Sequence, residues 1–156
     1  RRFVYVPQDG FVMSASLREN VAFEYGVESN QDIHVISALK SADFDPSGEN
    51  MASGLDTEIG ERGVNLSGGQ RQRVGMARAQ FHGAFESGRD IVLLDDCLSA
   101  VDVDTEMKII DRLIYGAWKD KTRILVTHRL SVLKYADEIW NLENGTLKKV
   151  TTYESK

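Results

Sequence analysis

The sequence lacks long hydrophobic runs, has a single cysteine and carries no excess of positive charge. No stretch of about 18 apolar residues occurs among its 156 residues, which argues against a membrane-spanning helix in this chain. The one cysteine, Cys97, cannot form an internal disulfide and fits a reducing compartment. A net charge of −5 disfavours a dedicated nucleic-acid-binding domain, because such a domain normally presents a basic face.

The remaining composition and its pattern indicate a globular α/β domain. Hydrophobic residues make up 42% of the chain and charged residues 28%. Apolar runs at 3–6, 91–94 and 123–128 predict strands, and the second half alternates strands with helices. This order predicts a parallel sheet whose later two strands are buried on both faces. Because the first strand starts at the chain's beginning, we expect the chain to be part of a longer protein.

Between the first strand and residue 80 no segment is a convincing strand, so we expect a helical subdomain over residues 14–82. Its first helix is predicted over 14–26. Ser14 or Ser16 is expected to cap it, and Glu19 lies three residues after Ser16, as in a capping box.

Two further helices are expected in this subdomain. Residues 30–41 form an amphipathic pattern that places Ile33, Ile36 and Leu39 on the inner side. Another helix begins after Ser67, a residue type favoured at helix N-caps.

The last third of the chain predicts a helix, a buried strand, a short helix and a hairpin. The hairpin follows from Asn144-Gly145, a strong turn signal between two apolar segments. The helix is expected over 104–118, with these residues facing inward: Met107, Ile110 and Ile114.

Polar side chains follow each of the three predicted strands. Gln8 follows the first, Asp95 and Asp96 the second, and His128 the third. Ligands of open parallel sheets bind beyond the carboxyl ends of the strands. Taken singly, a strand-end aspartate is more often a cap and a lone histidine more often structural. Together, an amide, carboxylates and an imidazole at one edge suit a site for Mg²⁺ and phosphate.

A second candidate site lies in the segment NLSGGQRQR. Ser67, Gly68 and Gly69 stand at a predicted helix N-terminus, where free backbone N–H groups and the helix dipole favour an anion. The same residues equally suit a simple N-cap with a glycine-rich turn, so the residues alone leave both interpretations open.

Five segments, in this order, resemble motifs of ABC-type ATPases. They resemble the Q-loop, the signature motif, the Walker B strand, the D-loop and the switch histidine: PQ at 7–8, LSGGQ at 66–70, IVLLDD at 91–96, SAVD at 99–102 and VTHR at 126–129. The longer segments VPQDGFVMSASLRENVAF and TEIGERGVNLSGGQRQRVGMARA look like nucleotide-binding domains of ABC exporters. The resemblance covers nearly the whole chain and implies ATP and Mg²⁺ as cofactors.

The resemblance implies roles for the strand-end residues. Gln8 would reach the Mg²⁺ and the reactive water and sense a membrane domain. Asp95 would hold the Mg²⁺, and His128 would contact the γ-phosphate. Asp96 stands where the family usually has a glutamate that acts as general base or orients the water.

The resemblance also implies partners. Such ATPases work as head-to-tail dimers, so a second nucleotide-binding domain would face the D-loop residues Ser99 and Asp102. Residues 57–63 (TEIGERG) match the segment that contacts a transmembrane domain in exporters. The γ-phosphate of ATP bound to the partner would be gripped by the signature residues Ser67, Gly68, Gly69 and Gln70.

One departure from the family pattern is the absence of G-x-x-x-x-G-K-[ST] from this sequence. The chain is therefore expected to be the C-terminal part of a P-loop NTPase (RecA-like) core with an inserted helical subdomain. Residues 1–13 would be the Q-loop strand and loop, 14–82 the helical subdomain, and 83–156 the Walker B, D-loop and switch-histidine part. Without the main phosphate cradle, we expect the chain alone to bind little ATP and to be inactive.

A second departure is Asp96 in place of glutamate. Its carboxylate sits about 1 Å further back, a misplacement that can cost on the order of 10²-fold in rate. We therefore expect a hydrolytically weak site in an asymmetric pair, although small shifts would let Asp96 work adequately.

The leading hypothesis is the motor domain of an exporter at the cytoplasmic face of a membrane, with no nucleic-acid partner. Two alternatives remain. One is a soluble ABC ATPase acting on DNA or ribosomes, and the other is a non-hydrolysing half that only regulates.

Overall fold

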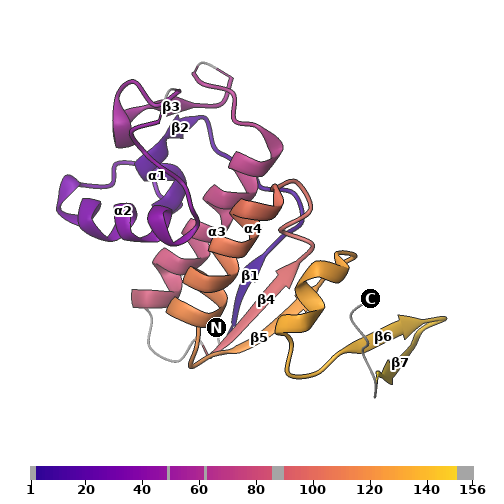
Figure 1. Cartoon of the computed structure of the whole chain (residues 1–156). Coiled ribbons are helices and arrows are strands. Elements are labelled where there is room, and N and C mark those ends of the chain that lie inside the picture. The colour runs from indigo at the N-terminus through magenta and orange to yellow at the C-terminus, as the bar shows by residue number, and fades with distance from the viewer. Residues whose placement is uncertain (1–2, 49, 62, 86–89, 151–156) are drawn as a thin grey trace.

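A three-stranded parallel sheet forms the base of the molecule (Figure 1). The computed structural model describes residues 3–48, 50–61, 63–85 and 90–150. The strands are β1 (Phe3–Val6), β4 (Ile91–Asp95) and β5 (Thr122–Val126), with β4 in the centre. All pairs are parallel, with Tyr5 opposite Leu93 and Asp95 opposite Val126. The predicted α/β class with a parallel sheet is confirmed.

Helices cover one face of this sheet and leave the other open. The helices α3 (Gly68–Phe85) and α4 (Val103–Ile109) lie on the same side of the strands (Figure 1). Toward them the sheet buries Val4, Val6, Val92 and Leu94. On the opposite face four apolar side chains are 48–57% exposed: Phe3, Tyr5, Ile124 and Val126.

The expectation that both later strands are buried on two faces was therefore wrong. In β4 every second residue is only half-buried, and in β5 every second residue is exposed. The physical reason is that no described element packs over this face of the sheet. The apolar composition of the two strands is that of fully covered strands, whereas the described part of the chain covers one side only.

The first helix, α1 (Leu17–Ala22), is shorter than predicted. Ser16 and Glu19 form the expected capping box, since Ser16 Oγ accepts from the Glu19 N–H at 3.2 Å and Glu19 Oε2 accepts from the Ser16 N–H at 3.0 Å. The helix ends at Phe23, whose φ of 55° lies in the left-handed region. Ahead of it, β2 (Ala15–Ser16) pairs antiparallel with β3 (Glu58–Ile59), so the subdomain contains a small sheet that was not predicted.

The second helix, α2 (Asp32–Ser41), has a different inner face from the one predicted. Ile33 is 73% exposed, whereas the spacing i, i+3, i+4, i+7 from Val35 gives the buried stripe Val35, Ala38, Leu39 and Ala42. Two alanines in this stripe allow close packing on α3. Of the predicted residues, Leu39 belongs to the stripe, Ile36 packs against the core while partly buried, and Ile33 does not face it. Short 3₁₀ turns precede the helix at Ser29–Gln31 (η1) and follow it at Gly54–Asp56 (η2).

The predicted helix over 104–118 is present but changes its winding. It begins as α4, capped by Asp102, and continues as the π-helical segment η3 (Ile110–Ala117). Met107 is 51% exposed, contrary to prediction, while Ile109, Ile110 and Leu113 are buried. The buried residues Glu106, Ile109, Ile110 and Leu113 follow the spacing i, i+3, i+4, i+7, and Met107 lies outside this stripe in α4, before the π segment begins.

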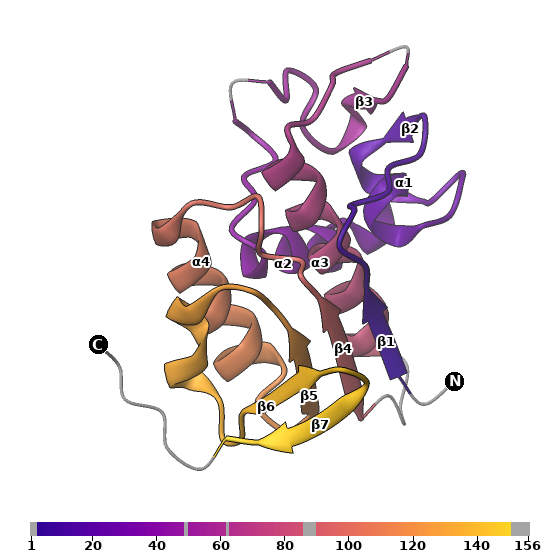
Figure 2. The same ribbon diagram turned by 90° about the vertical axis from the view of Figure 1, so that its right-hand side faces the viewer.

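The C-terminal part is a 3₁₀ segment, η4 (Leu130–Tyr135), followed by the predicted hairpin. Its strands are β6 (Trp140–Glu143) and β7 (Thr146–Lys149), and all eight strand residues are exposed. Asn144 and Gly145 have φ angles of 48° and 75°, as the predicted tight turn requires. The hairpin projects away from the helices in Figure 1, and in Figure 2 it is seen in front of β4 and β5.

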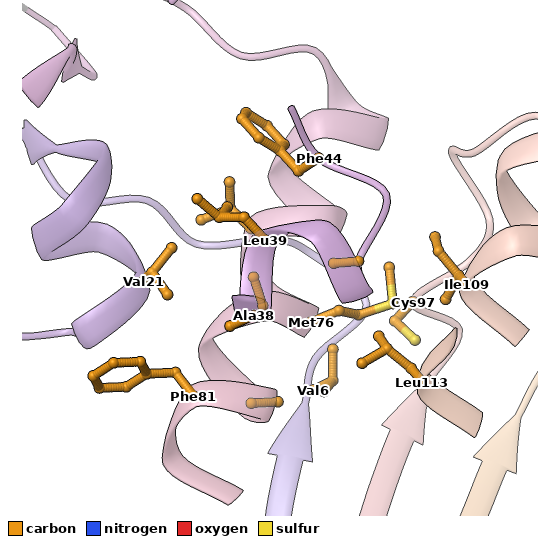
Figure 3. Packing of buried hydrophobic residues seen from close by; sticks show 14 of the residues in the cluster. Val6, Val21, Ala38, Leu39, Phe44, Met76, Phe81, Cys97, Ile109 and Leu113 are labelled. Atoms are coloured by element: carbon orange, nitrogen blue, oxygen red, sulfur yellow. The ribbon is translucent and has the colours of Figure 1, made fainter. Parts of the chain in front are cut away.

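One continuous apolar core joins the helices to the covered face of the sheet. Figure 3 shows Val6 of β1, Met76 of α3 and Leu113 of η3 around the buried Cys97. Leu39 and Phe44 extend this core into the helical subdomain (Figure 3). Among the described residues, no helix is long and apolar enough to cross a membrane.

Candidate functional site

The carboxyl ends of the parallel strands bring four of the predicted residues to one edge. Gln8 Nε2 donates to Asp96 Oδ2 at 3.3 Å, which links the ends of β1 and β4. Asp95 is the last residue of β4, and His128 is exposed two residues beyond the end of β5. The predicted meeting of Gln8 with Asp96 is therefore present as a direct contact.

Tyr5 is a member of this cluster that sequence reasoning missed. Its hydroxyl donates to Asp95 Oδ2 at 2.9 Å, and this bond, together with the nearby negative charge, raises the pKa of Tyr5. The signal was available in the pairing register. Tyr5 lies opposite Leu93, so Tyr5 and Asp95 point to the same face of adjacent parallel strands.

Asp96 differs from Asp95 in backbone and in surroundings. Its φ is 43°, a left-handed conformation that aspartate tolerates better than most residues. Its N–H donates to the Val126 carbonyl at 2.8 Å and so fixes it to β5. Its Oδ1 is buried and has no hydrogen-bond partner among the described residues. A buried carboxylate oxygen without a partner is costly unless a ligand satisfies it.

These residues fit the predicted magnesium ion. Mg²⁺ is usually held by one or two carboxylates, with water and substrate phosphate completing its shell. Asp95, the last residue of β4, and the Gln8 amide supply such oxygen donors at one edge. Among the described residues, no group of three or more His, Cys, Asp or Glu side chains is arranged to hold a metal ion.

The start of α3 is an N-cap in this structure. Ser67 Oγ accepts from the Gln70 N–H at 3.2 Å, and Gln70 Oε1 accepts from the Ser67 N–H at 2.8 Å. The glycines also have a packing role, since a Cβ on Gly69 would stand 2.6 Å from the Ala100 carbonyl oxygen and one on Gly68 3.4 Å from the Ala100 Cβ. The capping interpretation is confirmed, and the anion site remains a prediction.

Gln72, which sequence reasoning did not single out, joins two of the predicted motifs, PQ at 7–8 and SAVD at 99–102. It lies on α3, is 5% exposed, and its side chain contacts Gln8, Ser99 and Ala100. Gln72 lies four residues before Met76 and so shares its buried side of α3. A polar side chain at a buried helix position is unusual, and this could have marked Gln72 as a residue with a specific contact.

Asp102 acts as the N-cap of α4. Its Oδ1 accepts from the Thr105 N–H at 2.9 Å and its Oδ2 from the Thr105 hydroxyl at 2.8 Å. These bonds to the charged form lower the pKa of Asp102. Ser99 and Asp102 are both exposed, as a partner-facing loop requires, but their predicted interface role stays a prediction.

Arg129 holds the other side of the same loop. Its Nη1 donates to the Leu98 carbonyl at 2.5 Å and to the Val101 carbonyl at 2.9 Å. It also lies 3.0 Å from Oε2 of Glu106, a carboxylate that is 2% exposed. This ion pair does not have the alignment of a hydrogen bond, whereas Glu106 Oε1 accepts from the Ser131 hydroxyl at 2.8 Å. Neither Arg129 nor Glu106 was predicted from the sequence.

The segment predicted to meet a membrane domain lies at the far end of the helical subdomain. Within residues 57–63, β3 pairs with β2, and Glu58 and Glu61 are exposed. On the stretch that follows Gln8, Phe11 is 58% exposed and packs edge-to-face on Phe23, their ring centres 6.2 Å apart. Both segments therefore present accessible surface.

Cys97 follows the two aspartates but is sealed in the core. Burial raises the pKa of its thiol to about 12, and the Asp96 and Asp95 carboxylates add to the rise. We expect thiol reagents at pH 8 to modify this single cysteine only when the protein unfolds, so the labelling rate should follow urea concentration. Because the pKa of the Cys97 thiol is higher in the folded protein than in the unfolded chain, the neutral thiol favours the folded state. This contribution to the free energy of unfolding is fully present below the ordinary thiol pKa and is lost as the pH rises toward 12. Rapid labelling without urea would contradict this.

No family model matches the chain, but curated relatives do. A multidrug resistance protein of Leishmania tarentolae is 41% identical over 149 residues, 94% of this chain and 9% of the relative. A probable multidrug resistance ABC transporter ATP-binding/permease protein of Bacillus subtilis is 39% identical over 150 residues, 96% of this chain and 24% of the relative. ABC transporter C family member 2 of Dictyostelium discoideum is 41% identical over 152 residues, 97% of this chain and 10% of the relative.

The aligned region covers nearly all of this chain but only a small part of each relative. The chain spans between 9% and 24% of the length of these three proteins. Identity near 40% over almost every residue of the chain is nevertheless far more than a shared motif. The chain is therefore related, over nearly its whole length, to the ATP-binding domains of ABC transporters of the multidrug exporter type.

Proposed function

We propose that this chain is part of an ATP-hydrolysing motor domain that couples ATP binding and hydrolysis to export across a membrane. The observation that carries the proposal is the contact of Gln8 with Asp96 beside Asp95 at the carboxyl edge of a parallel sheet. It occurs in a chain homologous to ABC transporters.

In this proposal each strand-end residue has a distinct task. Asp95 and the Gln8 amide would hold Mg²⁺, and the ion would supply positive charge to neutralise the transferred phosphoryl group. Asp96 accepts a proton from the attacking water or orients it, and its unpartnered Oδ1 is available for this contact. His128, exposed beyond β5, contacts the γ-phosphate. Tyr5 keeps Asp95 in place through their hydrogen bond.

We further propose that the chain is the C-terminal part of a P-loop NTPase core with an inserted helical subdomain. The open face of the sheet supports this, because Phe3, Tyr5, Ile124 and Val126 are about half exposed where a complete core would cover them. The outer edge of β5 pairs with no described strand. Further secondary structure, including the phosphate-binding loop, would complete the sheet there, and the chain alone would bind ATP only weakly.

The proposed partners are a second nucleotide-binding domain and a transmembrane domain, with the assembly at the cytoplasmic face of a membrane. The exposed Ser99 and Asp102 and the start of α3 would face the second domain, where Ser67, Gly68, Gly69 and Gln70 would bind its ATP. Residues 57–63 and the stretch after Gln8 would face the membrane domain. Their accessibility in the structure supports this arrangement.

A second candidate is a nucleotide-binding half that does not hydrolyse ATP and only regulates its partner. The short carboxylate of Asp96 favours it, because the position normally needs the longer glutamate. In that case the start of α3 would still serve the active site of the partner domain.

The proposal is tested by replacing Asp95 with asparagine in the complete transporter. We expect Mg²⁺-dependent ATP turnover to fall by about 10²-fold or more, because a neutral amide holds the metal poorly and metal stabilisation amounts to several kcal/mol. Turnover is measured as phosphate release in reconstituted vesicles. Asp111→Asn is the matched control, since this exposed carboxylate lies on η3 away from the strand ends. Equal turnover in the two variants would refute the proposal.

A further inference from the structure

We infer that Gln72 is a positioning residue that holds the 98–102 loop and the segment at Gln8 in fixed register with the start of α3. The inference rests on the proposed function, because it assigns Gln72 to the geometry of the proposed site. Gln72 does not itself touch the reacting atoms. It acts through Gln8 on one side and through Ser99 and Ala100 on the other.

The side-chain amide of Gln72 uses both of its N–H donors and its oxygen. Nε2 donates to the Gln8 carbonyl at 3.0 Å and to Ser99 Oγ at 2.9 Å. Oε1 accepts from the Ala100 N–H at 3.0 Å. Three groups from two segments distant in sequence thus meet on one planar amide, which fixes their relative positions.

Burial makes these contacts hard to replace. Gln72 is only 5% exposed. A variant without the amide would leave the Ala100 N–H and the Gln8 carbonyl without this partner, and each such loss in a buried place is costly. Water has little room to substitute, because the loop lies against α3 where a Cβ on Gly69 would meet the Ala100 oxygen at 2.6 Å.

Gln72 and Arg129 form hydrogen bonds to different parts of the 98–102 loop. Arg129 holds its ends through the Leu98 and Val101 carbonyls, and Gln72 holds its middle at Ser99 and Ala100. Without Gln72 the middle of the loop would be free to move while the ends stay in place. The change would therefore be local and would not unfold the loop.

Through Gln8, Gln72 is also connected to Asp96, the proposed catalytic carboxylate. It holds the main chain of Gln8, whose side chain donates to Asp96 at 3.3 Å. A shift of Gln8 would therefore misplace the contact with Asp96. Because a displacement of about 1 Å can cost on the order of 10²-fold in rate, even a partial shift should lower turnover. Binding of ATP should change less than turnover, because Asp95 would still hold the Mg²⁺ when Gln8 shifts.

The test compares Gln72→Met and Gln72→Glu in the complete transporter with Val74→Ala. Methionine keeps the length of the side chain but forms none of the three hydrogen bonds, whereas glutamate keeps an acceptor for the Ala100 N–H and loses both donors. Val74 is a buried residue of the same helix and takes part in none of the three hydrogen bonds of Gln72, so its truncation should destabilise α3 while leaving those bonds in place. Phosphate release and amide hydrogen exchange at Ala100 are measured for each variant.

We expect Gln72→Met to lower kcat about tenfold with KM changed less than twofold, and to accelerate exchange at Ala100. Gln72→Glu should lower kcat while leaving that exchange slow. Val74→Ala should lower the melting temperature and leave kcat near the parent value. If both Gln72 variants kept the parent kcat, or if Ala100 exchanged no faster in Gln72→Met than in Val74→Ala, the inference would be wrong. A parent protein without turnover would refute the proposed function instead, and the exchange measurement would still decide the role of Gln72.

Discussion

Replacing Asp96 with glutamate is expected to raise ATP turnover at the site of this chain by up to about 10²-fold. The longer side chain moves the carboxylate about 1 Å toward the position where the reacting water would lie, and a misplacement of that size carries a penalty of this order. Gln8 already contacts Asp96 at 3.3 Å and would follow the carboxylate outward. Turnover is measured in the complete transporter with the partner site inactivated, so that only this site contributes.

The same replacement should slightly lower the melting temperature. Asp96 has a φ of 43°, and aspartate tolerates left-handed conformations better than glutamate does. A gain in rate together with a loss in stability would separate a catalytic effect from general improvement of the protein. Asp96→Asn is the control, since it keeps the size but removes the charge, and it should not raise turnover. Unchanged turnover in Asp96→Glu would instead mean that the aspartate already works adequately.

Replacing Arg129 with methionine is expected to lower the free energy of unfolding by about 3–5 kcal/mol. The change removes the ion pair at 3.0 Å and leaves the charge of Glu106, which is 2% exposed, without its partner. It also removes the donor to the Leu98 and Val101 carbonyls. The measurement is equilibrium unfolding of the protein in urea.

Arg112→Met is the matched control for this prediction. Arg112 also forms an ion pair with a carboxylate, at 2.9 Å from Asp43, but its side chain is 46% exposed. Exposed ion pairs contribute about 0–1 kcal/mol, so the loss should be several-fold smaller. A double variant that also replaces Glu106 with leucine should recover part of the stability, because no buried charge then remains unpaired. Similar losses for the two arginine variants would mean that burial of Glu106 is not what matters.

Local signals in the sequence predicted the framework well because each depends on few residues. The Asn144-Gly145 turn, the Ser16 capping box and the strand over 3–6 are determined by neighbours within a few positions. The meeting of Gln8 with Asp96 was predictable for a different reason. Parallel strands place their carboxyl ends at one edge whatever their loops do.

The failures all concern contacts between distant segments. The exposure of Ile33 and Met107 depends on where α2 and α4 meet their neighbours. A run of apolar residues predicts a buried strand, but it does not show whether one face of the sheet is covered or both. Gln72 and Arg129 contact residues 27 to 64 positions away, and no local rule relates them.

The open sheet also determines how this chain behaves on its own. The outer edge of β5 pairs with no strand in the described part of the chain, and Ile124 and Val126 beside it are more than half exposed. An unpaired strand edge next to exposed apolar side chains is a template for association with another chain. Trp140 and Leu142 of the nearby hairpin add further apolar surface. On its own, the chain should therefore self-associate through β5, and its yield in soluble form should fall as its concentration rises.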